Sequence, residues 1–176
     1  DCERAWDLKW IGLRYFNVAG AGWPDLADDA VMNLIPMVLD RVERGESAKI
    51  FGTDYDTPDG TCIRDYIHVL DLAEAHIAAL DVLAEGRQPD HHTYNVGTGL
   101  GTSVREIVDG LRRVIGWDFP VEELDRRAGD PPKLIGDPLS IGVDLGWKAN
   151  NGVEEILTSA WEGWQAGPRP ITVPGT

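Results

Sequence analysis

The chain is organised around the stretch IFGTDYDTPDGTCIRDYIHVLDLAEAHIAAL, residues 50–80. A short apolar run at Lys49–Gly52 has the composition of a strand. The tetrapeptide Thr57-Pro58-Asp59-Gly60 has the residues of a tight turn, and Cys62–Val69 reads as a second strand. Arg64 is a lone cation within that second strand. We therefore expect a strand, a turn and a second strand, with a candidate binding residue at the centre.

Strands and helices of mixed type surround this unit. Trp10–Val18 is mostly apolar, β-branched or aromatic and ends in a Gly-rich loop, which predicts a strand buried on both faces, as in a parallel sheet. Apolar periodicity, caps and Gly stops predict the remaining elements: helices over Ala30–Arg44 (after Asp28 and Asp29, regular from about Pro36), Leu72–Ala84 (capped by Asp71), Ser103–Ile115, Leu139–Leu145 and Val153–Gln165, and strands over Thr93–Val96 and Phe119–Leu124. This mixture predicts an α/β fold with a parallel-sheet contribution near the N-terminus.

The composition excludes several classes of partner. The formal net charge of −14 disfavours non-specific binding to nucleic acid or to an anionic membrane. Cys2 and Cys62 are the only cysteines, too far apart in sequence for a disulfide framework or a CxxC metal site, so a reducing cytoplasm fits them best. We expect no metal site, no nucleic acid and no membrane as partner.

Polar residues at strand ends and in loops are the candidates for ligand binding. Asn17 lies at the end of the first predicted strand, where open α/β sheets bind their ligands, but it could equally cap the loop. Arg126 and Arg127 are adjacent in a Gly/Pro loop of an acidic protein and suit a bidentate anion site. The alternative is that these two surface arginines pair with Asp125 or Asp130.

A Gly-rich loop, Gly97-Thr-Gly-Leu-Gly101, joins a predicted strand to a predicted helix. Such a loop invites a phosphate-binding interpretation. Its glycines match neither GxGxxG nor the P-loop pattern, so we interpret it as a tight turn. No arrangement of nucleophile, base and orienting group is evident in the sequence.

Several motifs together resemble one known family: LRYFNVAGA at 13–21, NLIP at 33–36, IFGTDYDTPDGTCIRDYIHVLDLAEAH at 50–76, YNVGTGLGTSV at 94–104, RRAGDPPKL at 126–134 and DLGW at 144–147. They resemble the C-terminal half of the UDP-glucose 4-epimerases, extended short-chain dehydrogenase/reductases that act on nucleotide sugars. The resemblance covers nearly the whole chain. The run DGTCIRDYIHVLDLAEAH is the most specific part of it.

The resemblance implies a fold and an activity. It implies that residues 1–22 end a Rossmann-type sheet, that residues 23–176 form mainly the smaller, mixed α/β substrate-binding domain, and that an N-terminal NAD-binding and catalytic half is absent from this chain. The family interconverts UDP-galactose and UDP-glucose in galactose metabolism by transient oxidation at the sugar C4 with bound NAD. The full-length protein is expected to be a cytoplasmic homodimer, and the present chain a piece of it.

The resemblance also assigns roles to residues of this chain. Tyr15 matches the tyrosine near the nicotinamide. The residues that match diphosphate-binding positions of the family are Asn17, Arg64 and Arg127. Tyr66 stands beside Arg64. The other matched positions are Asn33 and Leu34 for the walls of the nucleotide-sugar pocket, Lys49 and Phe51 for the uracil, Asp130 for the ribose or for orienting Arg127, and Leu134 for the choice of sugar.

The catalytic residues of the family have no counterpart here. The family uses a Tyr-x-x-x-Lys pair, and no tyrosine of this chain is followed four residues later by lysine. We therefore predict no catalytic residue in this chain and no activity of the chain alone. Three alternatives stay open: a truncated nucleotide-sugar-binding module without catalysis, an epimerase for UDP-N-acetylglucosamine or a pentose, and a sugar-nucleotide decarboxylase or dehydratase.

Overall fold

The computed structural model describes residues 2–28, 30–87 and 91–167, and Asp29 of the predicted helix start lies outside them. The helices are α1 (Cys2–Trp6), the 3-10 helix η1 (Pro24–Leu26), α2 (Leu34–Glu43), α3 (Val69–Ala84), α4 (Val104–Ile115), α5 (Leu139–Leu145) and α6 (Val153–Ala166). The strands are β1 (Gly12–Tyr15), β2 (Asn17–Ala19), β3 (Ala48–Phe51), β4 (Ile63–Arg64), β5 (Tyr66–His68), β6 (Thr93–Val96), β7 (Thr102–Ser103), β8 (Val121–Leu124) and β9 (Lys133–Leu134).

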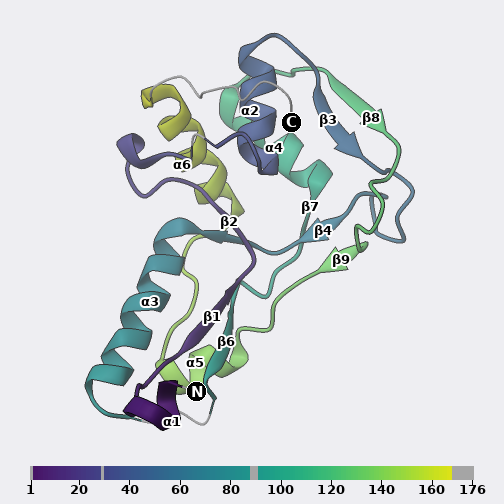
Figure 1. The fold of residues 1–176 in the computed structure, drawn as a ribbon. Coiled ribbons are helices and arrows are strands. Elements are labelled where there is room, and N and C mark those ends of the chain that lie inside the picture. The colour runs from purple at the N-terminus through teal and green to yellow at the C-terminus, as the bar shows by residue number, and fades with distance from the viewer. Residues whose placement is uncertain (1, 29, 88–90, 168–176) are drawn as a thin grey trace.

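Short, mostly parallel strand pairs form the centre of the molecule (Figure 1). β1 pairs with β6, β2 with β5 and β3 with β8, all in parallel. β4 lies between β7, which is antiparallel to it, and β9, which is parallel to it. β3 and β4, which flank the turn at Thr57–Gly60, do not pair with each other. The predicted α/β class with parallel strands is confirmed.

Two predicted strands are each divided in the structure. Trp10–Val18 was expected to be one strand buried on both faces, but β1 and β2 are separate, and the Tyr15 side chain is exposed. The two pieces pair with different partners, β6 and β5, because the chain crosses from one pair to the other at Phe16. The prediction of a continuous, doubly buried strand is therefore wrong.

Cys62–Val69 is divided at Asp65, whose carboxylate is fully buried. The Asp65 carboxylate accepts hydrogen bonds from the backbone N–H groups of Thr98 (2.9 Å), Gly99 (3.0 Å) and Gly136 (3.1 Å), and from the Thr98 hydroxyl (2.6 Å). Gly97 is required beside it, since a Cβ atom there would lie 2.5 Å from an Asp65 oxygen. A buried carboxylate with this many donors fixes three chain segments at one point.

Local signals predicted the start of α4 correctly and the starts of α2 and α3 incorrectly. The capping box of Ser103 and Glu106 is present at the start of α4, and α5 has the predicted bounds. α3 begins at Val69 instead of Leu72, and His68 caps it by accepting from the Leu70 N–H. Asp71, the predicted cap, is buried and accepts from the backbone N–H groups of residues 150 and 151. α2 begins at Leu34, two residues before the predicted start of its regular part, with Asn33 as N-cap residue.

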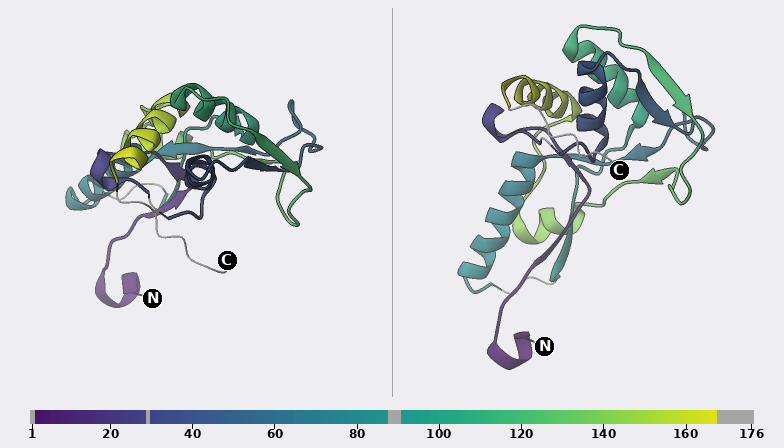
Figure 2. Two further views of the ribbon diagram at one scale, coloured as in Figure 1. Left: turned by 90° about the horizontal axis from the view of Figure 1, so that it is seen from above. Right: turned by 45° about the horizontal axis from the view of Figure 1, so that its top comes forward.

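The core has two hydrophobic clusters that meet along β5. The first lies among α2, α4, α6 and β3, where α4 and α6 are side by side (Figure 2). The second lies among α3, α5, β1 and β6. Tyr66 belongs to the first cluster and Ile67 to the second, as expected for neighbouring side chains on opposite faces of a strand. The residue pair Arg64–Asp65 immediately before β5 is therefore held at the junction of the two clusters.

The predicted division at residue 22 does not coincide with the boundary between these clusters, because Leu13 and Val18 pack with residues of α3, β6 and α5. The assignment of residues 1–22 to a Rossmann-type sheet stays a prediction. Among the described residues, no helix is both long enough and apolar enough to cross a membrane.

Asp65→Asn is expected to lower the free energy of unfolding by about 3 kcal/mol or more, because buried donors to a carboxylate would face an amide NH₂ or a weaker acceptor. Urea denaturation measures the change. Asp56→Asn, an exposed aspartate on the neighbouring loop, is the matched control and should leave stability almost unchanged. An Asp65→Asn protein as stable as the control would contradict the anchoring role.

Candidate functional site

A cavity of about 240 Å³ opens where α2, β3, β4 and the loop after β8 come together. Nine of the residues predicted to bind substrate line it: Asn17, Asn33, Leu34, Lys49, Phe51, Arg64, Tyr66, Arg127 and Asp130. The structure thus gathers side chains that are up to 113 positions apart in the sequence, counted from Asn17 to Asp130.

The cavity is cationic although the protein is acidic. The chain has 16 basic and 30 acidic residues, yet four cations line this cavity (Arg41, Lys49, Arg64 and Arg127) against one acid, Asp130. Cations concentrated in a cleft attract a negatively charged ligand. The local charge therefore fits a small anion or an anionic group of a larger ligand.

Arg64 is the most restrained of these cations. Its side chain is 13% exposed, and its Nη1 donates to the carbonyl oxygens of Ile63 (2.9 Å) and Pro131 (2.8 Å). Its Nη2 lies 3.5 Å from an Asp130 carboxylate oxygen. These contacts orient the guanidinium before any ligand arrives, and the carbonyl contacts neutralise none of its charge.

The structure separates the two adjacent arginines of the loop after β8. Arg127 lines the cavity, with its guanidinium carbon 3.8 Å from the centre of the Phe51 ring. Arg126 instead pairs with Asp54 at 2.5 Å and stands 4.3 Å over the Tyr55 ring. The prediction that left both arginines available for an anion is wrong for Arg126, and neither Asp125 nor Asp130 is its partner.

The α2 face supplies cavity residues that the sequence analysis missed. Met37 and Arg41 line the cavity together with Asn33, each four residues after the previous one, on one side of the helix. Arg41 is held by the Ser47 carbonyl (2.6 Å) and by Glu46 (3.1 Å). The helical spacing from Asn33 was the signal that could have identified both residues.

Strand spacing gives the same kind of signal for Cys62. Cys62 is a buried free cysteine that lines the cavity, and it stands two residues before Arg64 and four before Tyr66. Alternate residues of an extended segment share a face.

Tyr66 is almost fully buried, and burial raises its pKa to about 12, although Arg64 and an Asn17 hydrogen bond act in the opposite direction. Tyr66 is therefore a neutral phenol and not a base.

A second cavity of about 290 Å³ adjoins the first and shares Asn17, Asn33, Leu34 and Tyr66 with it. Tyr15 lies on this second cavity, and its hydroxyl is 2.7 Å from His76 Nε2. Leu134 lines neither cavity; it is half-exposed on β9, in register with Arg64 of β4. The roles assigned to Tyr15 and Leu134 stay predictions.

The Gly-rich loop does not offer a phosphate site. The N–H groups of Thr98 and Gly99, which a phosphate would need, donate to the buried Asp65 carboxylate instead. This finding agrees with the interpretation of the loop as a turn. This loop therefore offers no Gly-rich cradle for the pyrophosphate of a dinucleotide.

One serine lies close to a histidine, but the pair is not a catalytic dyad. His68 Nδ1 accepts from the Leu70 N–H, so the neutral ring carries its proton on Nε2, which lies 3.0 Å from Ser159 Oγ. The histidine is therefore a donor to Ser159 and cannot take its proton. Ser159 Oγ also accepts from the Ala21 N–H and donates to the Ile156 carbonyl. Among the described residues, no cluster of three or more His, Cys, Asp or Glu side chains could hold a metal ion.

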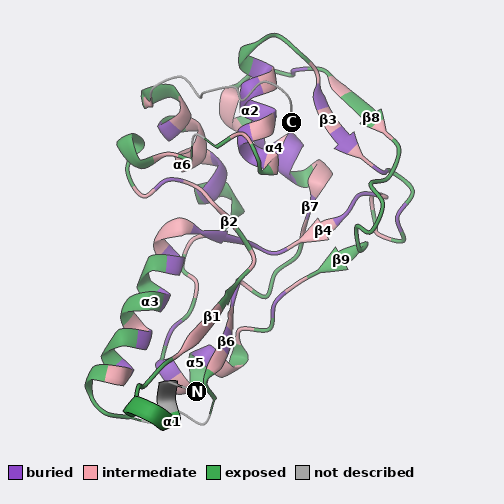
Figure 3. Ribbon diagram, in the orientation of Figure 1, coloured by how far each residue is buried: buried purple, intermediate pink, exposed green. Residues whose placement is uncertain are grey.

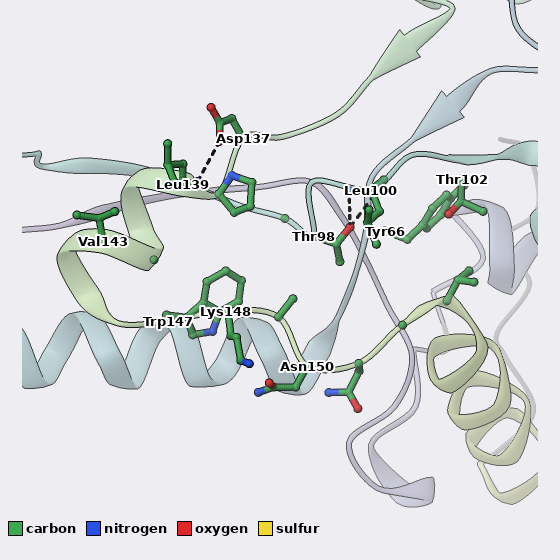
Figure 4. Close-up of a pocket in the computed structure, with 17 residues that line it drawn as sticks. Tyr66, Thr98, Leu100, Thr102, Asp137, Leu139, Val143, Trp147, Lys148 and Asn150 are labelled. Atoms are coloured by element: carbon green, nitrogen blue, oxygen red, sulfur yellow. Dashed lines mark hydrogen bonds between the residues drawn. The ribbon is translucent and has the colours of Figure 1, made fainter.

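A larger cavity, of about 660 Å³, lies beside α5, and Tyr66 lines it as well (Figure 4). Its rim includes the exposed side chains of Leu100, Leu139 and Val143, and Lys148 is the one cation among its lining residues. It lacks the convergent cations of the smaller cavity. Size alone therefore does not identify the binding site, and the smaller cavity is the better candidate.

A sequence model of the NAD dependent epimerase/dehydratase family matches residues 1–97, more than half of the chain. The chain belongs to this family. The resemblance inferred from the motifs is confirmed by relatives within it.

The UDP-glucose 4-epimerase of Rhizobium leguminosarum bv. trifolii is 40% identical over 170 residues, 94% of this chain and 51% of the relative. A crystal structure of a UDP-glucose 4-epimerase has a TM-score of 0.85 and 42% identity, covering 93% of this chain and 50% of that one. The Bifidobacterium longum UDP-glucose 4-epimerase, in complex with NAD+ and UDP, has a TM-score of 0.81 and 32% identity, covering 97% and 52%. The present chain thus spans about half the length of the relatives it matches.

Folding stability is expected to fall as the pH drops below about 6.5, because of His68. Burial lowers the pKa of His68 from its ordinary value of 6.5, more than the charges of Asp71 and Glu155 raise it. Below pH 6.5 the unfolded chain binds a proton at this histidine that the folded chain does not bind. The free energy of unfolding therefore decreases as the pH falls from 6.5 to the pKa of His68 in the folded state. Urea denaturation from about pH 7.5 to 5.5 measures the slope.

His68→Gln should flatten this slope, and His92→Gln, a change at an exposed histidine, should keep it. The aspartates with lowered pKa values (Asp54, Asp59 and Asp144) have ordinary values of 3.8 and titrate below this window. An unchanged slope in His68→Gln would contradict the assignment.

Proposed function

We propose that this chain is the UDP-sugar-binding part of a cytoplasmic, homodimeric NAD-dependent epimerase that interconverts UDP-galactose and UDP-glucose. The observation that carries the proposal is the convergence of Arg64 and Arg127 on one cavity that also holds an aromatic wall, Phe51. The relatives, which are UDP-glucose 4-epimerases, support it.

The diphosphate is assigned to the two cavity arginines. A diphosphate presents several anionic oxygens, and guanidinium groups bind such oxygens in pairs. Arg64 is oriented by backbone carbonyls, and Arg127 has no carboxylate partner within 4 Å among the described residues. Asn17, at the start of β2 on the same cavity, adds an uncharged donor for the diphosphate.

The uridine is assigned to the β3 side of the cavity. Phe51 offers an apolar ring, and Lys49 stands two residues before it on the same strand, paired at 3.8 Å with Glu122 of β8. Arg127 covers one face of the Phe51 ring. We therefore assign the uracil base to the side of the ring that Arg127 does not cover. Asp130 lies at the same wall and is assigned to the ribose; its carboxylate lies 3.5 Å from Arg64 and not, as the resemblance implied, in an ion pair with Arg127.

When bound, NAD would supply the hydride-transfer chemistry at the sugar C4. Tyr15, on the second cavity, is proposed to lie near the nicotinamide. The residues of this chain bind and orient the sugar nucleotide, and the proposal assigns no proton transfer to them. The full protein's preference for one UDP-sugar is assigned to Leu134, which lies on β9 outside both cavities.

Arg127→Ala is expected to weaken UDP binding about tenfold to a hundredfold, because charge-assisted hydrogen bonds contribute about 1.5–3 kcal/mol. Arg64→Ala should weaken binding at least as much, because it also frees the Pro131 carbonyl. Isothermal titration with UDP measures both. Arg105→Ala, an arginine paired with Glu123 outside the cavity, is the matched control. Loss of less than about 1 kcal/mol in both cavity variants would remove the diphosphate assignment.

The 176-residue chain, supplied with NAD and UDP-galactose, is expected to form no UDP-glucose, because it has no Tyr-x-x-x-Lys pair. A coupled assay for UDP-glucose measures this, with a full-length relative as the positive control. Turnover above that of a protein-free sample would show that the catalytic groups lie within this chain after all.

A further inference from the structure

The loop that joins β8 to β9 carries Arg127 and Asp130 into the cavity, and it is largely exposed (Figure 3). Besides the contact of Arg127 with the Phe51 ring and the hydrogen bond from the Ile63 N–H to the Pro132 carbonyl (2.8 Å), two side chains attach it to the rest of the molecule. Arg64 holds its end by donating to the Pro131 carbonyl at 2.8 Å. Arg126 holds its beginning by donating from Nε to a carboxylate oxygen of Asp54 at 2.5 Å and from Nη2 to the Asp54 carbonyl oxygen.

The attachment at Asp54 is more than a single surface ion pair. Arg126 binds both the side chain and the backbone of the same residue, and its guanidinium lies over the Tyr55 ring, which is buried. Three contacts from one planar group restrict its position more than a point charge would. The hydrogen bond from Arg126 also keeps the pKa of the Asp54 carboxyl below its ordinary value.

The attached residue is the direct neighbour of Arg127. Arg126 and Arg127 share a peptide bond, so fixing Arg126 limits the backbone positions open to Arg127. Neither Arg126 nor Asp54 lines the ligand cavity, whereas Arg127 does. Asp54 therefore has no direct contact with the cavity, and it can act on a bound nucleotide through its charge or through the loop that Arg126 carries.

We propose that Asp54 and Arg126 are positioning residues of the nucleotide site, which hold the loop of residues 125–132 so that Arg127 stays on Phe51 and faces the cavity. The inference rests on the proposed UDP-sugar function. It predicts an effect opposite in sign to simple electrostatics. Removing a negative charge near an anion site should strengthen anion binding, whereas releasing the loop should weaken it, because its residues must then be ordered on binding.

The experiment compares Asp54→Ala with Asp56→Ala in the 176-residue chain. Both changes remove one negative charge from the same exposed loop, and only Asp54 contacts Arg126. Isothermal titration with UDP is expected to show about tenfold weaker binding for Asp54→Ala and unchanged or slightly tighter binding for Asp56→Ala. Asp54→Glu, which keeps the carboxylate, should recover part of the affinity.

A thermodynamic cycle tests whether Asp54 acts through Arg127. Asp54→Ala should cost little further affinity in the Arg127→Ala background, because the group it positions is then absent. Equal losses in both backgrounds would overturn the positioning role, as would affinity in Asp54→Ala equal to or tighter than that of Asp56→Ala.

Hydrogen exchange without nucleotide separates this inference from the proposed function. The amides of residues 127–130 should exchange faster in Asp54→Ala than in Asp56→Ala, with exchange in α4 unchanged. If UDP does not bind the unaltered chain, the proposed function fails while faster exchange still supports the attachment of the loop. If the exchange rates of this loop are equal in the two variants, the positioning role is wrong whether or not UDP binds.

Discussion

The buried carboxylate of Asp65 is the interaction on which the rest of the structure depends. Its oxygens accept from backbone N–H groups of two separate segments, the Gly-rich loop after β6 and the turn before α5. The strand prediction ran through this residue, but its side chain breaks the strand into β4 and β5. As a result Arg64 and Tyr66, its two neighbours, lie in different sheets and still face one cavity.

This anchor also explains why a Gly-rich loop in a nucleotide-sugar enzyme family need not bind phosphate. The carboxylate occupies the backbone donors that a phosphate would use, so an internal anion replaces an external one. The cationic groups then gather elsewhere, on the β3 and β4 side of the cavity. Chain segments from β2 to the loop after β8 each contribute one or a few side chains to that cavity.

Local signals in the sequence were sufficient where the structure is determined locally. The capping box of α4, the bounds of α5 and the strand β6 follow from residues within a few positions of one another. Asp71 was misassigned as a helix cap because its partners, residues 150 and 151, are about eighty positions away. The pairing of Arg126 with Asp54 spans 72 positions, and no periodicity encodes it. Asn17, Arg64 and Arg127 were candidates from the residues alone, and the resemblance added the other six predicted cavity residues. Spacing along α2 and β4 could have added Met37, Arg41 and Cys62.

We propose that the cavity between α2 and β3 holds a uridine diphosphate group between Arg64 and Arg127. A crystal structure of the chain grown with UDP tests it most directly. We expect diphosphate oxygens within about 3 Å of both guanidinium groups, and the base beside Phe51. A nucleotide bound instead in the larger cavity beside Leu139 and Val143, or with its phosphates away from both arginines, would contradict the account.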